Sequence, residues 1–285
     1  MPFFSQFDER AKPKGSRDPL GFEVVWSHFG RRLVGNLTTI TSSVVNFKVA
    51  LLGFVCAHEL SENQQRPYTT EQIRHTFLRY EQLAAYLRLD SGNASSLMGI
   101  TRAKTSFDHL QDGKRIALSS SIDAQILSNQ ASYGLWGLYS TALRQAALLK
   151  GDLREPTELA RTLVTAMLGS NSDLKEALKS YIGADQSIAI QDVKGLSKRF
   201  GDALRNQSAD RDLVRQLLTF THEDEQLRNV YEGLFSYANE WIKQTNQNDG
   251  SDLSRSHLLH SLAESDNALL ARRAQDILKV EPVLV

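Results

Sequence analysis

The sequence has a single cysteine and no long hydrophobic run, and both absences limit where the protein works. Because Cys56 is the only cysteine, the chain forms no disulfide within itself and fits a reducing compartment. The longest uninterrupted apolar run covers residues 49–57, well short of the roughly 20 residues that cross a bilayer. The amino terminus shows no basic segment followed by an apolar stretch, so we expect no signal peptide. These features favour a soluble, cytoplasmic protein with no membrane partner.

The sequence also lacks an excess of either charge. Its 33 Lys and Arg residues balance 33 Asp and Glu residues, so the whole chain does not have the basic excess of a dedicated nucleic-acid-binding protein. The charges are unevenly distributed, because residues 1–150 carry 17 basic against 12 acidic side chains and residues 151–285 carry 16 against 21. This asymmetry indicates a basic contact surface in the first half, or polarity within an assembly.

Hydrophobic periodicity predicts a mainly α-helical, multi-helical fold. Apolar residues recur at helical spacing in residues 22–33, and residues 44–60 form a pattern that is apolar nearly all round, as in a buried helix. Thr69 and Gln72 have the spacing of a capping box at the start of the next helix. Helical patterns continue to residue 279, so strands are expected to contribute little to the fold.

The predicted helices form two packed halves preceded by an arm. Residues 1–20, which contain three prolines, predict a flexible arm. Residues 21–150 then form an N-terminal helical domain, and residues 151–285 form a C-terminal one. The segment "KGDLREP", residues 150–156, has the composition of a linker between them. The sequence allows at most a small β hairpin or wing at Asp112-Gly113, and "SIAI", residues 187–190, has the pattern of a short strand.

The stretch "SNQASYGLWGLYSTALRQAALL", residues 128–149, combines aromatic residues with glycines in one predicted central helix. Glycine lowers helix stability by roughly 1 kcal/mol relative to alanine, so something should offset it. The candidate interaction residues are Tyr133, Gly134, Trp136 and Gly137. One interpretation is core packing, in which glycines three residues apart let another backbone approach closely. The other is a ligand or base-stacking platform made by Tyr133 and Trp136.

A second hypothesis concerns nucleic acid. Residues 69–119 have the order of a winged-helix domain, namely a helix, a short helix and an Asp-Gly hairpin. Nearby acidic residues, Asp108 and Asp112, weaken this reading. The candidate phosphate-contacting residues in the first half are Arg31, Arg32, Arg102, Lys104, Lys114 and Arg115. We expect any DNA contact to be weak, salt-sensitive and independent of sequence.

Metal sites and catalytic signatures are poorly supported. His257, His260 and Glu264 would share one helical face, but no further ligand lies near them in sequence. Asp185 and the Asp192-Val193-Lys194 segment have the acidic-x-Lys spacing of one nuclease class, although a single short strand does not supply the frame for that metal chemistry. The sequence contains neither GxSxG nor GxGxxG. We therefore expect no metal, no cofactor and no catalytic residue, with a helical enzyme of unrecognised site as a third alternative.

Two segments carry a resemblance to a group of proteins. "RDPLGFEVVWSHFGRRLVGNLTTITSS" and "LSNQASYGLWGLYSTALRQAALL" resemble segments of helical proteins encoded in bacterial anti-phage defence islands. The resemblance implies an accessory or scaffold subunit that acts beside an ATPase or a nuclease. The most favoured function is accordingly a non-catalytic subunit of a bacterial multiprotein complex that works by protein–protein contact, with auxiliary nucleic-acid contact. The alternative is a winged-helix-like DNA-binding protein.

Overall fold

The computed structural model describes residues 41, 43–62, 64, 68–219 and 255–280, together with scattered residues between 225 and 243. The predicted arm, the helical pattern at residues 22–33, and Arg31 and Arg32 lie outside the described residues. The described residues up to 235 belong to one compact unit, and those from 236 onward to another. The two units are therefore described separately.

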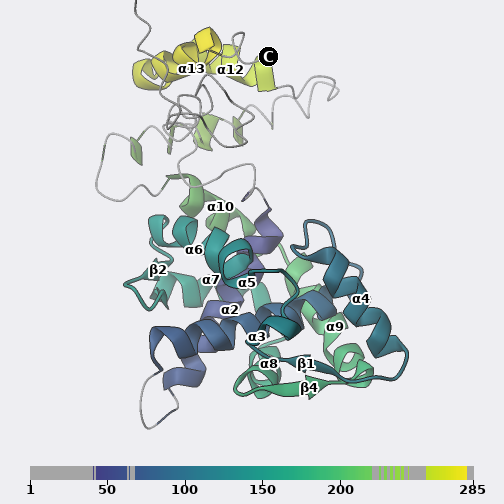
Figure 1. The fold of residues 1–285 in the computed structure, drawn as a ribbon. Coiled ribbons are helices and arrows are strands. Elements are labelled where there is room, and N and C mark those ends of the chain that lie inside the picture. The colour runs from purple at the N-terminus through teal and green to yellow at the C-terminus, as the bar shows by residue number, and fades with distance from the viewer. Residues whose placement is uncertain are drawn as a thin grey trace, which may run out of the picture. The chain divides into compact units, whose positions relative to one another are not determined.

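The prediction of a mainly α-helical fold is confirmed (Figure 1). The described residues contain 11 α-helices and two small two-strand sheets. The helices of the first unit are α2 (Val44–Glu62), α3 (Thr70–Asp90), α4 (Ile100–Gln111), α5 (Gln130–Tyr133), α6 (Leu135–Gln145), α7 (Glu158–Leu168), α8 (Leu174–Ile182), α9 (Ile190–Arg205) and α10 (Asp210–Thr219), with a 3₁₀ turn η2 at Ile122–Ala124. The strands are β1 (Ile116–Leu118), β2 (Leu149–Lys150), β3 (Glu155–Pro156) and β4 (Gln186–Ile188).

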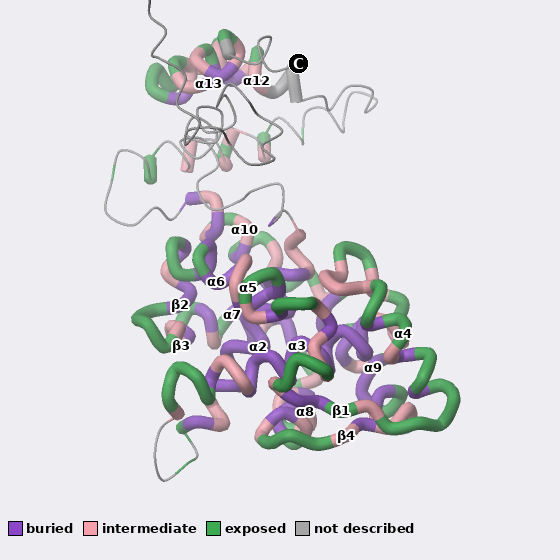
Figure 2. Tube along the Cα trace, viewed as in Figure 1, coloured by how far each residue is buried: buried purple, intermediate pink, exposed green. Residues whose placement is uncertain are grey.

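Helices α2 and α3 form the centre of the first unit (Figure 2). As the sequence predicts, α2 is buried nearly all round, including Phe47, Leu52 and Phe54 with no exposed surface. By length and composition α2 is the one described helix that could cross a membrane, and most of it is buried inside the unit. The predicted capping box of α3 is present, because the Thr69 hydroxyl accepts from the Gln72 amide while the Gln72 side chain accepts from the Thr69 amide.

The first unit continues through the segment where the sequence analysis placed a domain boundary. Residues 149–156 form the hairpin β2–β3, in which Leu149 lies opposite Pro156. Buried residues from Phe47 to Leu217 belong to one continuous hydrophobic cluster. The predicted linker at 150–156 therefore lies within a compact unit, because Leu149 and Pro156 are themselves buried.

The strand pairing differs from the predicted hairpin. Asp112 and Gly113 follow the end of α4, but β1 pairs antiparallel with β4, so that Ile116 lies opposite Ile188. The predicted strand at 187–190 is present as β4, and its partner comes from a segment about 70 residues earlier. Residues 69–119 thus do not contain the local hairpin that a winged-helix domain would use as its wing.

The second unit contains α12 (Arg255–Ala263) and α13 (Ala268–Val280), which pack against each other. Their buried side chains include Leu262, Leu270, Ala274 and Ile277. Both helices lie in the part of the chain where the sequence analysis predicts that helical patterns continue, up to residue 279.

Candidate functional site

The predicted central helix is two helices. It is interrupted at Gly134, whose backbone is extended with φ −90° and ψ −170°. The Asn129 side chain caps α5 by accepting from the Ser132 amide at 3.1 Å. The buried Glu81 carboxylate of α3 accepts from the Leu135 amide at 2.7 Å, which satisfies one of the free N–H groups at the start of α6. The prediction of one continuous helix is wrong because Glu81 provides an alternative partner for this amide.

The two glycines of this segment are explained by close contacts within the chain. A Cβ atom on Gly134 would lie 2.5 Å from the Gln130 carbonyl oxygen and 2.6 Å from both Glu81 carboxylate oxygens, and one on Gly137 would lie 2.2 Å from the Ser132 carbonyl oxygen. These distances are too short for any other residue. The glycines therefore let α5, α6 and Glu81 pack together, which agrees with the core-packing interpretation. At Gly134 a close neighbour is a side chain of the long helix α3, and at Gly137 it is the backbone of α5.

Glu81 is a buried carboxyl group that sequence reasoning missed. It is 3% exposed, and its second oxygen accepts from the Gln130 side-chain amide at 2.9 Å. Burial raises its pKa from the usual 4.5 to about 7, and the hydrogen bonds from Leu135 and Gln130 only partly oppose this effect. No apolar helical pattern predicts a glutamate at this position, so the sequence gives no signal for it.

The two aromatic residues of the segment have different surroundings. Tyr133 is 61% exposed at the end of α5, whereas Trp136 is 4% exposed. The Trp136 ring packs against Phe54 and Phe77, with ring centroids 5.3 and 5.5 Å away. The Arg154 guanidinium lies 4.0 Å from the centroid of the Trp136 ring, in a cation–π contact. Trp136 is thus a core residue whose outer surface is covered by an arginine.

Arg154 is held over Trp136 by an unusual backbone conformation. It has φ 56°, a left-handed value that residues other than glycine adopt at a free-energy cost. The preceding residue, Leu153, has its carbonyl oxygen 3.0 Å from His58 Nε2, so the turn of the β2–β3 hairpin is fixed to α2. Burial, followed by the positive charges of Arg144 and Arg74, lowers the Arg154 pKa to about 10. The fold therefore keeps three arginines close together despite their repulsion.

These arginines line two neighbouring hollows, and we call Arg74, Arg144, Lys150 and Arg154 the arginine face. A hollow of about 360 Å³ is lined by Arg74, Trp136 and Arg154. A second hollow, of about 570 Å³, is lined by Arg144 and Lys150. Asp152 lines both hollows, so they adjoin at the hairpin turn.

The charges of the arginine face are only partly neutralised. Arg74 pairs with Glu71 at 3.2 Å, and Lys150 pairs with Glu155 at 3.3 Å. Within the described part of the chain, neither Arg144 nor Arg154 forms an ion pair. Sequence reasoning missed Arg74 and Arg154, because residues 80 positions apart in sequence are brought together only by the packing of the hairpin beside α3.

The predicted nucleic-acid contacts are separated from the arginine face. Arg102 and Arg115 both line a groove of about 660 Å³ between α4, β1 and η2. Lys104 and Lys114 are exposed nearby but do not line this groove. Figure 1 shows α4 and the β2–β3 hairpin at opposite sides of the unit. The structure thus has two distinct basic regions in the first unit.

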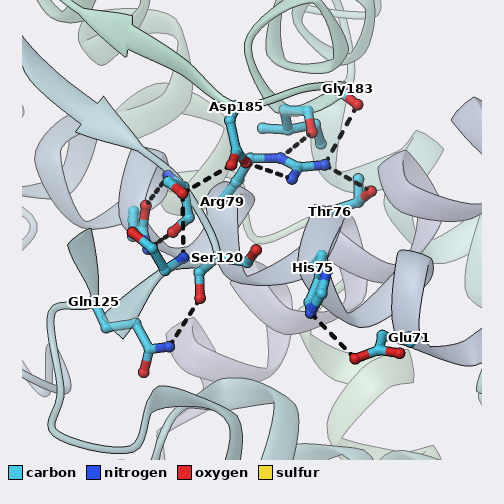
Figure 3. Close-up of polar contacts among 12 residues, drawn as sticks. Glu71, His75, Thr76, Arg79, Ser120, Gln125, Gly183 and Asp185 are labelled. Carbon is cyan, nitrogen blue, oxygen red and sulfur yellow. Dashed lines mark hydrogen bonds and ion pairs between the residues drawn. The ribbon is translucent and has the colours of Figure 1, made fainter. Parts of the chain in front are cut away.

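Asp185, considered above as a nuclease carboxylate, serves a structural role (Figure 3). Arg79 of α3 donates through Nη1 to Asp185 Oδ1 at 2.9 Å and through Nε to the Ile182 carbonyl oxygen at 2.7 Å. The Ser119 hydroxyl donates to Asp185 Oδ2 at 2.9 Å. These contacts tie the end of α8 and the start of β4 to α3 and β1.

The other residues of the suggested nuclease and zinc sites do not converge with it. Asp192 accepts from the Ala189 amide at 2.9 Å and so caps α9, while Lys194 is exposed on the same helix. The side chain of His257 lies outside the described residues. Among the side chains that are described, no group of three or more His, Cys, Asp or Glu residues is arranged to hold a metal ion.

Comparisons with known proteins give no match: no family model, no curated protein and no solved structure is similar to this chain.

Proposed function

We propose that this protein is a helical subunit of a multiprotein complex and that the arginine face is the surface through which it binds a partner protein. The observation that carries this proposal is that the charges of Arg74 and Arg144 both act on Arg154, which itself lies over Trp136. Like charges repel, and two of these three arginines have no carboxylate among the described residues paired with them. An anionic partner bound at this surface would relieve the repulsion. The left-handed backbone of Arg154 supports this, because strained residues cluster at functional sites.

A protein partner fits this face better than a nucleic acid does. Glu71 and Asp152 line the same hollows as the arginines, and their carboxylates would repel a continuous line of phosphates. A protein partner can place its acidic side chains opposite the arginines and away from Glu71 and Asp152, so that this repulsion does not arise. The two hollows also suit individual anchoring side chains, and arginine is enriched among the residues that dominate protein interfaces.

The resemblance to helical proteins of defence islands supports a non-catalytic role in the cytoplasm beside an ATPase or a nuclease. On this proposal, the chain supplies contacts while its partner supplies the chemistry. Tyr133, which is 61% exposed in the same segment, is a further candidate interaction residue. Gly134, Trp136 and Gly137 support this segment from within the core.

The test is co-expression with the proteins encoded beside this chain's gene, followed by size-exclusion chromatography with mass measurement by light scattering. Wild-type protein should form a stable complex with one of them. The double charge reversal Arg144→Glu with Arg154→Glu should abolish that complex. The matched control, Arg102→Glu with Lys104→Glu on α4, should retain it. A complex that survives the reversal at the arginine face, or that the control disrupts equally, contradicts the proposal.

Stability has to be separated from binding in this experiment, because Arg154 also covers Trp136. The single variant Arg144→Glu changes an exposed residue that makes no ion pair among the described residues, so its melting temperature should equal that of wild type. It should nevertheless weaken the complex. If Arg144→Glu binds the partner with unchanged affinity, the arginine face is not the interface.

A further inference from the structure

Helix α9 has an exposed glycine that no contact within the described chain explains. Gly195 lies six residues into the 16-residue helix, and a Cβ atom added there would meet no heavy atom within 4 Å. Glycine is the least favourable ordinary residue in a helix interior. At Gly201 of the same helix the usual reason is visible, since a Cβ would lie 2.9 Å from the Ser91 and Asn93 side chains. Gly195 instead faces open space, where it leaves backbone accessible to an external ligand.

Unpaired cations lie on one side of this glycine. Residues three positions either side of Gly195 are Asp192 and Lys198, and each lies about 60° from it around the helix at 3.6 residues per turn. Lys194 and Lys198 are both exposed, and neither ammonium group forms an ion pair with a described residue. Other cations of the helix are paired, as in the contact of Arg205 with Asp202 at 2.7 Å.

On the opposite side of Gly195 the cation comes from another element. Arg115, which precedes β1, donates to the Ser187 carbonyl oxygen at 2.7 Å and lies 3.8 Å from Asp192. These contacts place Arg115 beside the first turn of α9, and its side chain remains 56% exposed. Lys114 is the exposed residue next to it. Cations therefore lie on both sides of the accessible backbone at Gly195.

We propose that the exposed face of α9, together with Lys114 and Arg115, binds the phosphate backbone of a nucleic-acid duplex. We call this surface, made of Lys114, Arg115, Lys194, Gly195 and Lys198, the α9 face. Phosphates would lie on the cations on either side, and Gly195 would let the sugar-phosphate chain approach the helix backbone. The proposal is independent of the arginine face, and it adds Lys194, Gly195 and Lys198 to the Lys114 and Arg115 that the sequence suggested.

The composition of the α9 face distinguishes a duplex from the other macromolecules. Its described exposed side chains are polar or basic, whereas the core of a protein interface is depleted in lysine and enriched in aromatic residues. Interfaces with DNA are more polar and more positively charged than those with protein. Single strands bind largely by stacking on aromatic rings, and the exposed stripe of α9 carries none. Two carboxylates lie beside this face. Asp192 accepts from the Ala189 amide and lies 3.8 Å from Arg115, and Asp202 pairs with Arg205 at 2.7 Å.

The first measurement is the fluorescence anisotropy of a labelled 20-base-pair DNA duplex titrated with the full chain at several salt concentrations. Each neutralised phosphate contributes about 0.9 to the slope of log K against log salt. Three of the four cations have no ion pair with a described residue and Arg115 lies beside Asp192, so the predicted slope is between about −2.7 and −3.6, with similar values for unrelated sequences. Absence of binding at low salt, or strong preference for one sequence at physiological salt, would overturn the proposal.

Variants then locate the contact. Lys194→Gln with Lys198→Gln should weaken binding about tenfold or more at low salt and reduce the magnitude of the slope by about 1.8. The matched control, Arg144→Gln with Lys150→Gln on the arginine face, should bind DNA as wild type does. Equal losses in both pairs would show diffuse charge attraction and refute the assignment.

Gly195→Leu separates binding from folding. Leucine favours helix more than glycine does, and the space beside Gly195 is open, so the melting temperature should be unchanged or higher. DNA affinity should nevertheless fall, because the side chain blocks the approach to the backbone. Unchanged DNA affinity in Gly195→Leu contradicts the proposal. The proposal is also contradicted if the Lys194→Gln with Lys198→Gln variant loses the co-expressed protein partner but still binds DNA. The α9 face would then be a protein interface.

Discussion

Replacing Glu81 by glutamine should make the protein more stable at alkaline pH. The folded protein holds this buried carboxyl at a pKa of about 7, against the usual 4.5, so the folded state binds its proton more tightly than the unfolded state does. The contribution of Glu81 to stability is therefore fully present below pH 4.5 and is lost as the pH rises through 7. At 1.36 kcal/mol per pKa unit, ionisation of Glu81 lowers the free energy of unfolding by about 3 kcal/mol at pH 8.

Glutamine removes this ionisation but also disturbs one hydrogen bond. The side-chain oxygen can still accept from the Leu135 amide, while the new amide group faces the Gln130 amide, which donates to Glu81 in the wild type. The lost bond should cost about 1 kcal/mol. By the same linkage, partial ionisation of Glu81 lowers the free energy of unfolding of the wild type by about 1 kcal/mol at pH 5. The variant and wild type should therefore be about equally stable at pH 5, with the variant about 2 kcal/mol more stable at pH 8.

Urea denaturation at pH 5, 6, 7 and 8 measures this difference directly, provided that the slope of free energy against urea is the same for both proteins. Arg88, the charged residue that lines the same small cavity as Glu81, is present in both proteins, so its contribution cancels in the difference between them. A Glu81→Gln variant that is destabilised by the same amount at every pH would refute the reasoning, because it would show that Glu81 does not titrate in this range.

Three further substitutions test other parts of the fold. Glu59→Gln should destabilise most at neutral pH and progressively less as the pH falls, since lysine hydrogen bonds outweigh burial and lower the Glu59 pKa; urea titrations at pH 4.5 and 8 check the trend. Lys48→Met should cost about 3–5 kcal/mol in urea denaturation, because the buried Lys48 ammonium donates to Asp210 Oδ1 at 2.7 Å and to two carbonyl oxygens. Gly137→Leu should lower the melting temperature, as overpacking against the Ser132 carbonyl costs about 1–3 kcal/mol and outweighs a helix-propensity gain of up to about 1 kcal/mol. A Gly137→Leu protein as stable as wild type that loses its partner would instead show that this glycine is part of the interface.

Local patterns in the sequence predict the helices well but predict their interruptions poorly. The capping box at Thr69 and Gln72 and the buried character of α2 depend on neighbouring residues, so both are visible in the sequence. The break at Gly134 depends on Glu81, more than 50 residues earlier, and no local pattern records it. The same reason explains the hairpin error, since Ile116 pairs with Ile188 rather than with its own neighbours.

The candidate sites show the same division. The sequence singles out Trp136 because its segment is unusual in composition. It does not single out Arg74 and Arg154, which line the same hollow as Trp136. The sequence suggests Lys114 and Arg115 as phosphate contacts, because they are adjacent basic residues. It suggests Lys194 only as part of a nuclease motif, because its closeness to Arg115 depends on the fold. Gly195 carries no signal until the structure shows that nothing packs against it.

The position of α2 in the chain has a consequence for synthesis on the ribosome. This helix packs against α7, α8 and α9, and Lys48 completes its contacts only with residues 204–210. At about 5–20 residues per second, the ribosome needs roughly 8–30 s after α2 to deliver those elements. During that interval α3, α6 and β3 emerge first and cover part of this apolar helix, while the surface that packs against α7, α8 and α9 stays uncovered until those helices follow. We expect this uncovered surface to favour binding by a ribosome-associated chaperone until α9 and the contacts of Lys48 with residues 204–210 complete the core.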